Sequence, residues 1–402
     1  MSLFYILWYL FQFWLAFYLI LPSLFLLIYI IKYISKTHFS IVKKKSVYKK
    51  NFDFAIIITV HKETILVDAL VDSLLKQNYQ RYLIYIVADA CKSDLGQLHG
   101  PSVIVLHPEK DLNAKILSID YAIGHFQRPH DVLIIFDSDN LAHPNFLASL
   151  NQYFQKGFKA VQTNLLPKNI NNIFEKADAI GNIFSNFMER EIRMELGFSS
   201  AIWGSGIAID TSLYKEIAFD NLLGGFDKRV QADIVKKTTQ IAFAKEAIVY
   251  DEKINNGSSL QKQRTRWLHA YFKYFKLSVS TFFLGIKRFN LNLAFFGFIN
   301  LRPPYFILFF LCGLVATLNL WINYKWFLAW CFIVGLFIVS LSTIILLRAN
   351  NRKTIWSIFF MPLFAIYQIS ALIKIRKANK AFLKTEHSKL IYIEDILRNE
   401  SV

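Results

Sequence analysis

The chain has 402 residues, of which 54% are hydrophobic, and its 46 lysines and arginines against 29 aspartates and glutamates give a formal charge of +17. This hydrophobic content argues against a purely soluble enzyme, and the charge indicates an anionic partner: nucleic acid, anionic lipid or an anionic substrate. Nucleic acid is the weakest of the three, because the basic residues cluster beside apolar segments. The three cysteines have neither metal-binding spacing nor an even disulfide framework, and we interpret them as reduced and structural.

Residues 1–50 are predicted to form a transmembrane helix and a basic juxtamembrane linker. Residues 3–31 contain no charged side chain, a run longer than the ~20 residues that a spanning helix needs. The run is too long for the core of a signal peptide and lacks a small-residue cleavage site. Seven lysines follow between Lys32 and Lys50. Because basic residues flank spans on the cytoplasmic side, we expect the N-terminus outside and residues from about 50 to 300 in the cytosol.

Residues 51–270 are predicted to form one α/β domain. Short β-branched runs at 52–60, 82–89, 103–108 and 131–139 are typical of strands, and 61–78 and 113–126 have helical periodicity. This order implies a mostly parallel sheet, whose ligands bind beyond the carboxyl ends of the strands. Polar residues gather at three of these ends, which suggests one crevice: Thr59, His61 and Glu63; Asp89 and Asp94; Asp137 and Asp139.

The stretch DVLIIFDSDN places two carboxylates after an apolar strand. In extended backbone, Asp137 and Asp139 point to the same side, which suits a divalent cation such as Mg²⁺ or Mn²⁺. An ordinary polar turn before a helix at Pro144 is the alternative. Asp89 suits a base or ribose hydroxyl, or caps a turn. Lys115 suits a phosphate as a point charge, or is a surface lysine.

The last third of the chain alternates basic and apolar segments. Residues 261–267, QKQRTRW, are predicted to be a solvated helix face, a membrane anchor or a specific binding site. Residues 271–303 mix lysine with aromatic residues, a pattern typical of helices in the membrane interface. Two spans, 304–322 and 326–347, form an antiparallel pair within 304–347. Within 348–402 we expect an interfacial helix over 354–375 and a cytosolic basic tail. A spanning 354–375 would place the basic tail outside, against the positive-inside rule.

Six motifs follow one another between about residues 54 and 270: TVHKE, VADACKSD, NAKILSIDYAI, FDSDN, WGSGIAI at 203–209 and QRTRW at 263–267. Together they resemble the membrane-embedded family 2 glycosyltransferases, the inverting GT-A enzymes that include cellulose, chitin and hyaluronan synthases. FDSDN matches the DxD motif of that family and QRTRW its QxxRW motif. The resemblance implies an α/β fold, a cytosolic GT-A domain with flanking transmembrane and interfacial helices.

The same resemblance implies a UDP-sugar donor, Mg²⁺ or Mn²⁺, and a set of site residues. The metal ligands would be Asp137 and Asp139. The planar guanidinium of Arg266 suits a diphosphate, and the flat indole of Trp267 suits a sugar ring. The donor-binding residues would be Thr59, Glu63, Asp89, Lys115, Asp137, Gln263, Arg264 and Arg266. The acceptor-binding residues would be Trp203, Gly204, Ser205, Gly206 and Trp267.

The catalytic base has two candidates, Asp227 and Asp233. Counting back from AIVYDE, which resembles a later landmark of the family, selects Asp227. The family's glutamate before that aspartate is replaced by Phe226, so the orientation and pKa of the base must be set in another way.

The basic tail contains one more similarity. Residues 381–387, AFLKTEH, resemble the gating loop that covers the nucleotide in cellulose synthase, with His387 in place of a basic residue. This function requires a cytosolic tail, which agrees with an interfacial rather than a spanning helix over 354–375.

These observations favour a β-linked polysaccharide synthase in the plasma (inner) membrane, with its catalytic domain in the cytoplasm. Its partners would be a UDP-sugar, a growing glycan or lipid-linked acceptor and membrane lipids, with no nucleic acid. Three spans form little of a channel wall, which favours the alternative, a transferase that adds one sugar to a lipid or lipid-linked acceptor. A homo-oligomer of the synthase would supply the missing wall. A catalytically inactive membrane scaffold or glycan-binding subunit is an alternative of another class.

Overall fold

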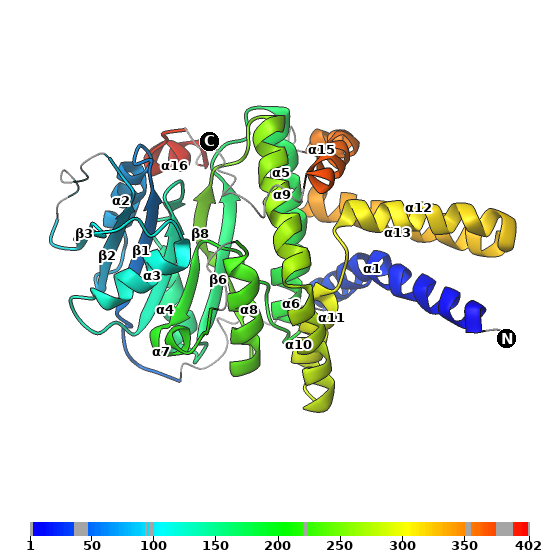
Figure 1. Cartoon of the computed structure of the whole chain (residues 1–402), viewed down its shortest axis with the longest axis horizontal. Coiled ribbons are helices and arrows are strands. Elements are labelled where there is room, and N and C mark those ends of the chain that lie inside the picture. The colour runs from blue at the N-terminus through cyan, green and yellow to red at the C-terminus, as the bar shows by residue number, and fades with distance from the viewer. Residues whose placement is uncertain are drawn as a thin grey trace.

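The computed structural model describes residues 3–35, 47–92, 95, 98, 100–219, 224–349, 355–374 and 389–400. Its centre is a sheet of eight strands in the order β3-β2-β1-β4-β7-β6-β8-β5 (Figure 1). The strands are β1 (Phe54–His61), β2 (Tyr82–Asp89), β3 (Val103–Leu106), β4 (Val132–Asp137), β5 (Leu141–Ala142), β6 (Ala160–Pro167), β7 (Ile207–Asp210) and β8 (Ala242–Asp251). The pairs among β3, β2, β1 and β4 are parallel, as predicted, whereas β7 runs antiparallel to both β4 and β6.

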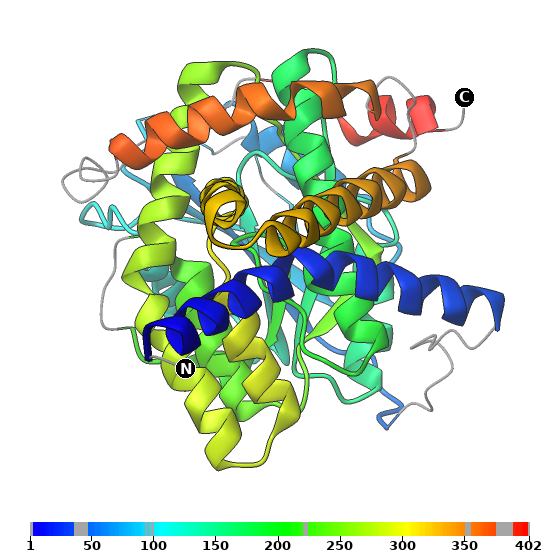
Figure 2. The same ribbon diagram turned by 90° about the vertical axis from the view of Figure 1, so that its right-hand side faces the viewer.

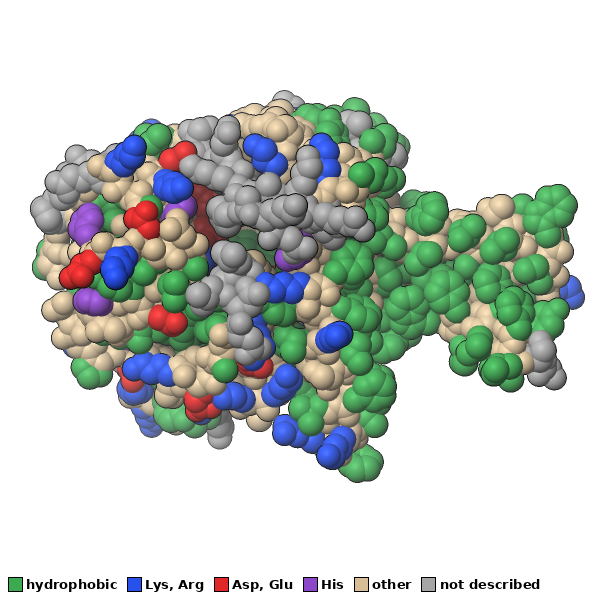
Figure 3. All heavy atoms as spheres, in the orientation of Figure 1, with side chains coloured by type: hydrophobic (Ala, Val, Ile, Leu, Met, Phe, Trp, Pro, Cys, Tyr) green, Lys and Arg blue, Asp and Glu red, His purple; other side chains and the backbone are tan. Residues whose placement is uncertain are grey.

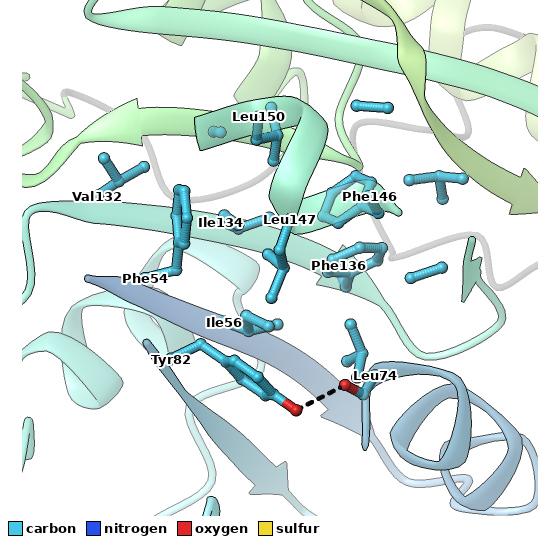
Figure 4. Close-up of a cluster of buried hydrophobic side chains, with 14 of the residues drawn as sticks. Phe54, Ile56, Leu74, Tyr82, Val132, Ile134, Phe136, Phe146, Leu147 and Leu150 are labelled. Atoms are coloured by element: carbon cyan, nitrogen blue, oxygen red, sulfur yellow. Dashed lines mark hydrogen bonds between the residues drawn. The ribbon is translucent and has the colours of Figure 1, made fainter. Parts of the chain in front are cut away.

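Helices cover both faces of this sheet because its central strands are apolar on both sides. Ile56 and Ile134 belong to the core under α2 and α4, and Ile57 and Ile135 to the core under α3 and α8. Figure 4 shows the first core, with Leu147 of α4 above the strands. The helices of this part are α2 (Val67–Leu75), α3 (Lys115–Gly124), α4 (Phe146–Gln155), α5 (Ile173–Asn186), α6 (Ile192–Glu195), α7 (Thr211–Lys215), α8 (Phe226–Lys237) and α9 (Gly257–Lys273), with a π-helical segment, η2 (Phe187–Glu191), between α5 and α6.

The helix predicted over 61–78 begins later than expected. Strand β1 continues to His61, and Lys62 has a left-handed backbone with φ +68°. The Lys62 amide donates to the Asp89 carbonyl of the neighbouring strand at 3.1 Å. Pairing with β2 therefore holds this segment in the sheet, and α2 starts only at Val67.

Three apolar helices project from the sheet domain: α1 (Leu3–Ile34), α12 (Tyr305–Ile322) and α13 (Tyr324–Arg348) (Figure 1). Among the described residues, these are the helices long and apolar enough to cross a membrane. Hydrophobic side chains cover the projecting part in Figure 3, while charged side chains gather on the body. The N-terminal end of α1 and the α12–α13 turn both lie far from the sheet. The predicted apolar helices are thus confirmed, and the whole is compatible with membrane integration.

One buried amide links the three projecting helices. The Gln12 Oε1 of α1 accepts hydrogen bonds from Asn319 Nδ2 of α12 and Trp330 Nε1 of α13, each at 2.8 Å. All three residues are at most 1% exposed. Because an apolar surrounding offers no water, such bonds between helices fix the packing of the bundle.

Several helices lie across the base of the projecting bundle. Figures 1 and 2 show α15 (Met361–Ile373) and the hairpin of α10 (Phe275–Lys287) and α11 (Leu291–Asn300) running roughly crosswise to α12. The 13 residues of α15, preceded by the 3₁₀ segment η3 (Trp356–Phe360), are fewer than a span requires. Lys374 Nζ donates to Gln261 Oε1 of α9 at 2.8 Å, which ties the end of α15 to the domain. We propose that these helices lie in the membrane interface, within the predicted segments 271–303 and 348–402.

The last described segment returns to the sheet domain. Ile393, the first residue of α16 (Ile393–Glu400), is buried with Ala69, Leu141 and Tyr250. Lys389 Nζ pairs with the buried carboxylate of Glu175 at the start of α5. The predicted gating loop at 381–387, with His387, lies outside the described residues.

Candidate active site

The carboxyl ends of β1, β2 and β4 bring the predicted polar residues to one edge of the sheet. Thr59 lies in register with Asp137 on one side, and His61 with Asp89 on the other. Glu63 follows in an exposed loop, where its amide donates to the His61 carbonyl at 2.9 Å. The three strand ends therefore share one edge, as predicted, whereas Asp94 lies outside the described residues.

The backbone at this edge adopts conformations that non-glycine residues rarely take. Lys62 after β1, Ala90 after β2 and Asn113 before α3 have φ of +68°, +55° and +50°. Such residues cluster at ligand-binding sites, where the surrounding structure holds the backbone in place. This clustering is a second indication, independent of side-chain chemistry, that the edge binds a ligand.

Asp89 organises the loop that leads to Lys115. Its carboxylate accepts hydrogen bonds from the amides of Leu112 at 2.7 Å and Asn113 at 2.8 Å, and lies 3.1 Å from His61 Nδ1. The Asp89 side chain is only 3% exposed. Asp89 thus sets the position of the loop before α3, and its predicted contact with the donor stays a prediction.

Lys115 joins the DxD motif to the WGSG loop. Its Nζ lies 2.5 Å from Asp137 Oδ1 and 2.7 Å from the carbonyl oxygen of Gly204. The Asp137 amide donates to the hydroxyl of Ser205 at 3.1 Å. Asp137 is 45% exposed and Lys115 24%, so the pair is open to a ligand. Three segments, with contacts that span 22, 68 and 89 residues of the chain, thereby form one polar cluster.

Gly206 is required by the backbone of the WGSG loop. Its φ is +61°, and a Cβ at this position would collide with the Thr163 hydroxyl. The Gly206 amide donates to the Ile135 carbonyl of β4 at 2.9 Å. This close approach holds the loop against the strand that carries the DxD motif.

Asp139 completes the predicted metal pair and is 9% exposed. Among the residues described, no group of three or more His, Cys, Asp and Glu could hold a metal ion. Two carboxylates still fit Mg²⁺ or Mn²⁺, because these ions commonly bind one or two protein carboxylates together with substrate phosphates and water. Asp137 already forms an ion pair with the Lys115 ammonium group, so a positive charge is accommodated beside this carboxylate.

The QRTRW motif lies on α9 and faces the DxD motif. Burial lowers the pKa of Arg266, while the charges of Asp137 and Asp139 act to raise it. Arg264 pairs with Asp178 of α5 at 2.5 Å, and its guanidinium lies 4.2 Å from the centre of the Trp267 ring. Arg266 is thus close enough to the two aspartates for their charges to act on it, and Arg264 is engaged with Asp178 and Trp267; the predicted roles of both arginines at the donor stay predictions.

The other two motif residues differ in exposure. Trp267 is 50% exposed, as a platform for a sugar would be. Gln263 Oε1 is buried, and no hydrogen-bond partner for it occurs in the described part of the chain. An amide oxygen in this state is available to a ligand donor.

Asp227 lies in the first turn of α8. Gly225, with φ +72°, precedes the helix, and Lys228 Nζ lies 3.9 Å from the Asp227 carboxylate. Asp233, the other candidate, is bound by Arg229 of its own helix at 2.9 Å. The Phe226 ring, where the resemblance expects a glutamate, is buried with its centre 5.8 Å from Lys115 Nζ. We name the edge formed by the carboxyl ends of β1, β2 and β4, together with Lys115, the donor edge. Asp227 follows a residue that lies beside Lys115 at this edge, and its ion pair is longer than that of Asp233. Its role as a base stays a prediction.

Sequence reasoning missed two buried cations near the site. Lys168 lies under the DxD motif, where its Nζ donates to the Asp139 carbonyl at 3.3 Å and burial lowers its pKa. Arg190 lies 3.3 Å from the centre of the Trp203 ring and is 0% exposed. The signal for Arg190 was present in the sequence: the stretch FMEREIR places charges inside an otherwise largely apolar helical segment.

A comparison with protein families identifies the domain. The family described as "Glycosyltransferase like family 2" matches residues 51–270, more than half of the chain. The chain belongs to glycosyltransferase family 2. The motif-based resemblance is thus confirmed, and the mixed sheet with its flanking helices is the GT-A fold of this glycosyltransferase. No curated protein matches the chain.

One solved structure has a similar fold over almost its whole length. The mannosyltransferase PcManGT from Pyrobaculum calidifontis, in complex with GDP-Man and Mn²⁺, is similar over 91% of this chain and 99% of that chain, with a TM-score of 0.53 and 12% identity. TarS from S. aureus (13% identity, 53% and 38% covered, TM-score 0.37) and GalNAc-T7 with UDP, GalNAc and Mn²⁺ (16%, 52% and 45%, 0.40) are more distant. The first similarity extends over the flanking helices as well as the sheet.

Proposed function

We propose that this glycosyltransferase moves a sugar from a nucleotide-diphosphate donor, a UDP-sugar in the first place, to a hydroxyl group at the membrane surface, with inversion. The observation that carries the proposal is the pair of Lys115 with Asp137 at the end of β4, on which α9 also brings the charge of Arg266 to act. These residues come from three separate motifs. An inactive scaffold would have no need for this convergence, which makes that alternative the weakest.

The reaction needs a base on the acceptor side and cations on the donor side. Asp227 would take the proton of the acceptor hydroxyl, whose oxygen attacks the anomeric carbon as the bond to the diphosphate breaks. Arg266 and Lys115 would hold the negative charge that develops on the leaving nucleotide. The single displacement inverts the anomeric centre, so an α-linked donor gives a β-linked product.

Asp137 and Asp139 would hold Mg²⁺ or Mn²⁺. When bound, the cation stabilises charge on the departing diphosphate. The mannosyltransferase of the same fold was solved with GDP-Man and Mn²⁺, and a donor panel should therefore include GDP-sugars beside UDP-sugars. The proposed donor site is completed by Thr59, Glu63, Asp89, Gln263 and Arg264, and the acceptor side consists of Trp203, Gly204, Ser205, Gly206 and Trp267.

Single addition and processive synthesis differ in what the projecting helices must do. The hydrogen bonds that Gln12 accepts from both α12 and α13 hold the three helices together. This packing favours single addition to a membrane-borne acceptor over translocation of a glycan by one chain. Processive synthesis, which the QRTRW motif supports, remains the second candidate and would draw further channel wall from another copy.

The orientation in the membrane follows from the charges. The N-terminal end of α1 and the turn at Asn323 lie at the end of the bundle farthest from the sheet (Figure 1). The seven lysines of 32–50 lie at the other end of α1 in the sequence. We therefore place the catalytic domain in the cytoplasm, against the plasma membrane.

The deciding experiment measures nucleotide release by the full-length protein in nanodiscs with UDP- and GDP-sugars, Mg²⁺ and Mn²⁺. We expect release from one donor, lost in Asp139→Asn and Asp227→Asn. One discrete lipid-soluble product would support single addition, and a ladder of products processive synthesis. A folded protein that neither releases nor binds any of these nucleotides would contradict the enzymatic function.

A further inference from the structure

Cations outnumber carboxylates where the glycosyltransferase domain meets the projecting helices. Arg302 Nη2 lies 3.0 Å from the Glu189 carboxylate, between α11 and α12. Burial acts to raise the pKa of Glu189, but Arg302, Arg193, Lys228 and Arg190 hold it below its ordinary value. The charges of four cations thus act on this carboxylate, and Arg302 is in direct contact with it. We name these five residues the junction cluster.

Two of these cations are buried with unused donors. Arg190 is 0% exposed and Arg193 4%. Within the described part of the chain, Nε and Nη2 of Arg190 and Nη1 of Arg193 have no hydrogen-bond partner. Burial lowers the pKa of Arg190 to about 9 and that of Arg193 to about 10, so both remain charged at neutral pH. Buried guanidinium N–H groups without hydrogen-bond partners are costly, and an anionic ligand would satisfy them.

The stacking of Arg190 on Trp203 does not satisfy these donors. An indole ring attracts the face of a guanidinium, whereas its N–H groups point outward in the plane. Among the described residues, the Arg190 guanidinium donates through Nη1 to Asn186 Oδ1. Aromatic contact therefore explains where Arg190 lies but not why its other donors are unused.

The junction cluster faces the membrane helices and the catalytic side at once. A small cavity there is lined by side chains that include Tyr18 of α1, Glu189, Arg193, Arg302 and Tyr305 of α12. The π-helical segment η2, which carries Glu189 and Arg190, is a type of distortion frequent at functional sites. On the other side, Lys228 directly follows the proposed base, Asp227. The junction cluster thus lies between the projecting helices and the proposed base.

We infer that the junction cluster binds the phosphate of a lipid-linked acceptor and thereby presents the acceptor hydroxyl to the glycosyltransferase site. The inference rests on the proposed function and names its acceptor class. A phosphate offers several acceptor oxygens to the unused guanidinium donors and balances the excess positive charge. A neutral glycan would leave that charge uncompensated.

The test compares two acceptors that differ only in the phosphate. In the first, a monosaccharide is joined to a polyprenyl tail through a diphosphate; in the second, the same sugar is joined to the same tail by a plain glycosidic bond. Thermal unfolding of the full-length protein in detergent, without donor, measures binding. Transfer of labelled sugar in nanodiscs measures KM for each acceptor and for the donor. We expect stabilisation and transfer with the phosphate-linked acceptor only.

Variants locate the binding. Arg193→Gln and Arg302→Gln are expected to raise KM for the phosphate-linked acceptor on the order of tenfold or more, with KM for the donor unchanged. Arg302 is 16% exposed, so its variant remains informative if Arg193→Gln does not fold. Arg229→Gln, on α8 one residue after Lys228 and paired with Asp233, is the matched control and should behave like the unmodified protein.

Three outcomes would overturn the inference. Equal stabilisation and transfer with the neutral acceptor would show that the phosphate is not recognised. Equal loss in Arg302→Gln and Arg229→Gln would show that the junction cluster is not the site. Stabilisation by phosphatidic acid without any competition against transfer would assign the cluster to a structural lipid. If slow donor hydrolysis persists throughout, the proposed function stands and only the acceptor class fails; if the donor is neither bound nor hydrolysed, both fail.

Discussion

The donor edge and the membrane bundle of this glycosyltransferase use polar side chains in opposite ways. At the donor edge, Lys115 and Asp137 form an ion pair, but their side chains are 24% and 45% exposed, so a ligand can reach either residue and replace its partner. In the bundle, Gln12 bonds Asn319 and Trp330 in full burial. Solvent exposure thus distinguishes polar groups that can bind a ligand from polar groups that hold helices together. The junction cluster fits neither description, because it is buried and incompletely paired.

The largest expected effect lies at the donor edge. Asp227→Asn should lower kcat by about 10²–10⁴-fold, because the acceptor hydroxyl loses its general base. Asp233→Asn is the matched control on the same helix, since Asp233 is engaged with Arg229. Nucleotide release under saturating donor measures both. Equal losses in the two variants would remove Asp227 from its role.

Arg266→Lys should lower activity by about 10–100-fold while keeping the positive charge, because lysine cannot present a planar fork to a diphosphate. The loss should appear with every donor that the protein accepts. Arg128→Lys serves as the control, because the half-exposed Arg128 pairs with the buried Asp53 at 3.0 Å. An Arg266→Lys variant with unchanged kinetics would mean that charge alone matters at this position.

In the bundle, Gln12→Leu should destabilise the protein by about 1–3 kcal/mol and leave the kinetics of donor binding unchanged. The variant leaves the donors of Asn319 and Trp330 without their common acceptor in an apolar surrounding. Thermal unfolding in detergent measures the loss. Ser23→Ala, which removes a 2.7 Å contact with Ser340 between two small hydroxyls, should cost less. A greater loss in Ser23→Ala would contradict the central role of Gln12.

The smallest effect concerns the contact of the C-terminal segment. Burial acts to raise the pKa of Glu175, but hydrogen bonds from Lys389 and neighbouring groups lower it below its ordinary value of 4.5. A carboxyl group with a lowered pKa adds stability above pH 4.5, and this stability is lost as pH falls through the folded-state value. We expect a loss below about 1 kcal/mol, seen as a steeper acid decrease of Tm in the unmodified protein than in Glu175→Gln. Glutamine also suits the capping box of α5, so the substitution isolates the charge.

Short-range pattern made much of this protein predictable. The apolar runs of α1, α12 and α13 are long enough to be identified without a partner, and the β-branched runs of β1 and β4 are apolar on both faces. The alternation of strands and helices along the chain then implied a parallel sheet, in which the carboxyl ends of the strands lie at the same edge. The helix start was misplaced at His61 because pairing of Lys62 with Asp89, 27 residues away, overrides local periodicity.

By itself, the sequence determined the apolar helices, the parallel half of the sheet and the motifs of the family, because each depends on residue type and spacing within one segment. Only the tertiary structure decided which charges are satisfied. The link from Lys115 to Asp137 and Gly204, the pairing of Arg264 with Asp178, and the unused donors of Arg190 each depend on residues from distant segments. A charge in a sequence has no known partner until folding brings one within reach, and for this reason the junction cluster became visible only in three dimensions.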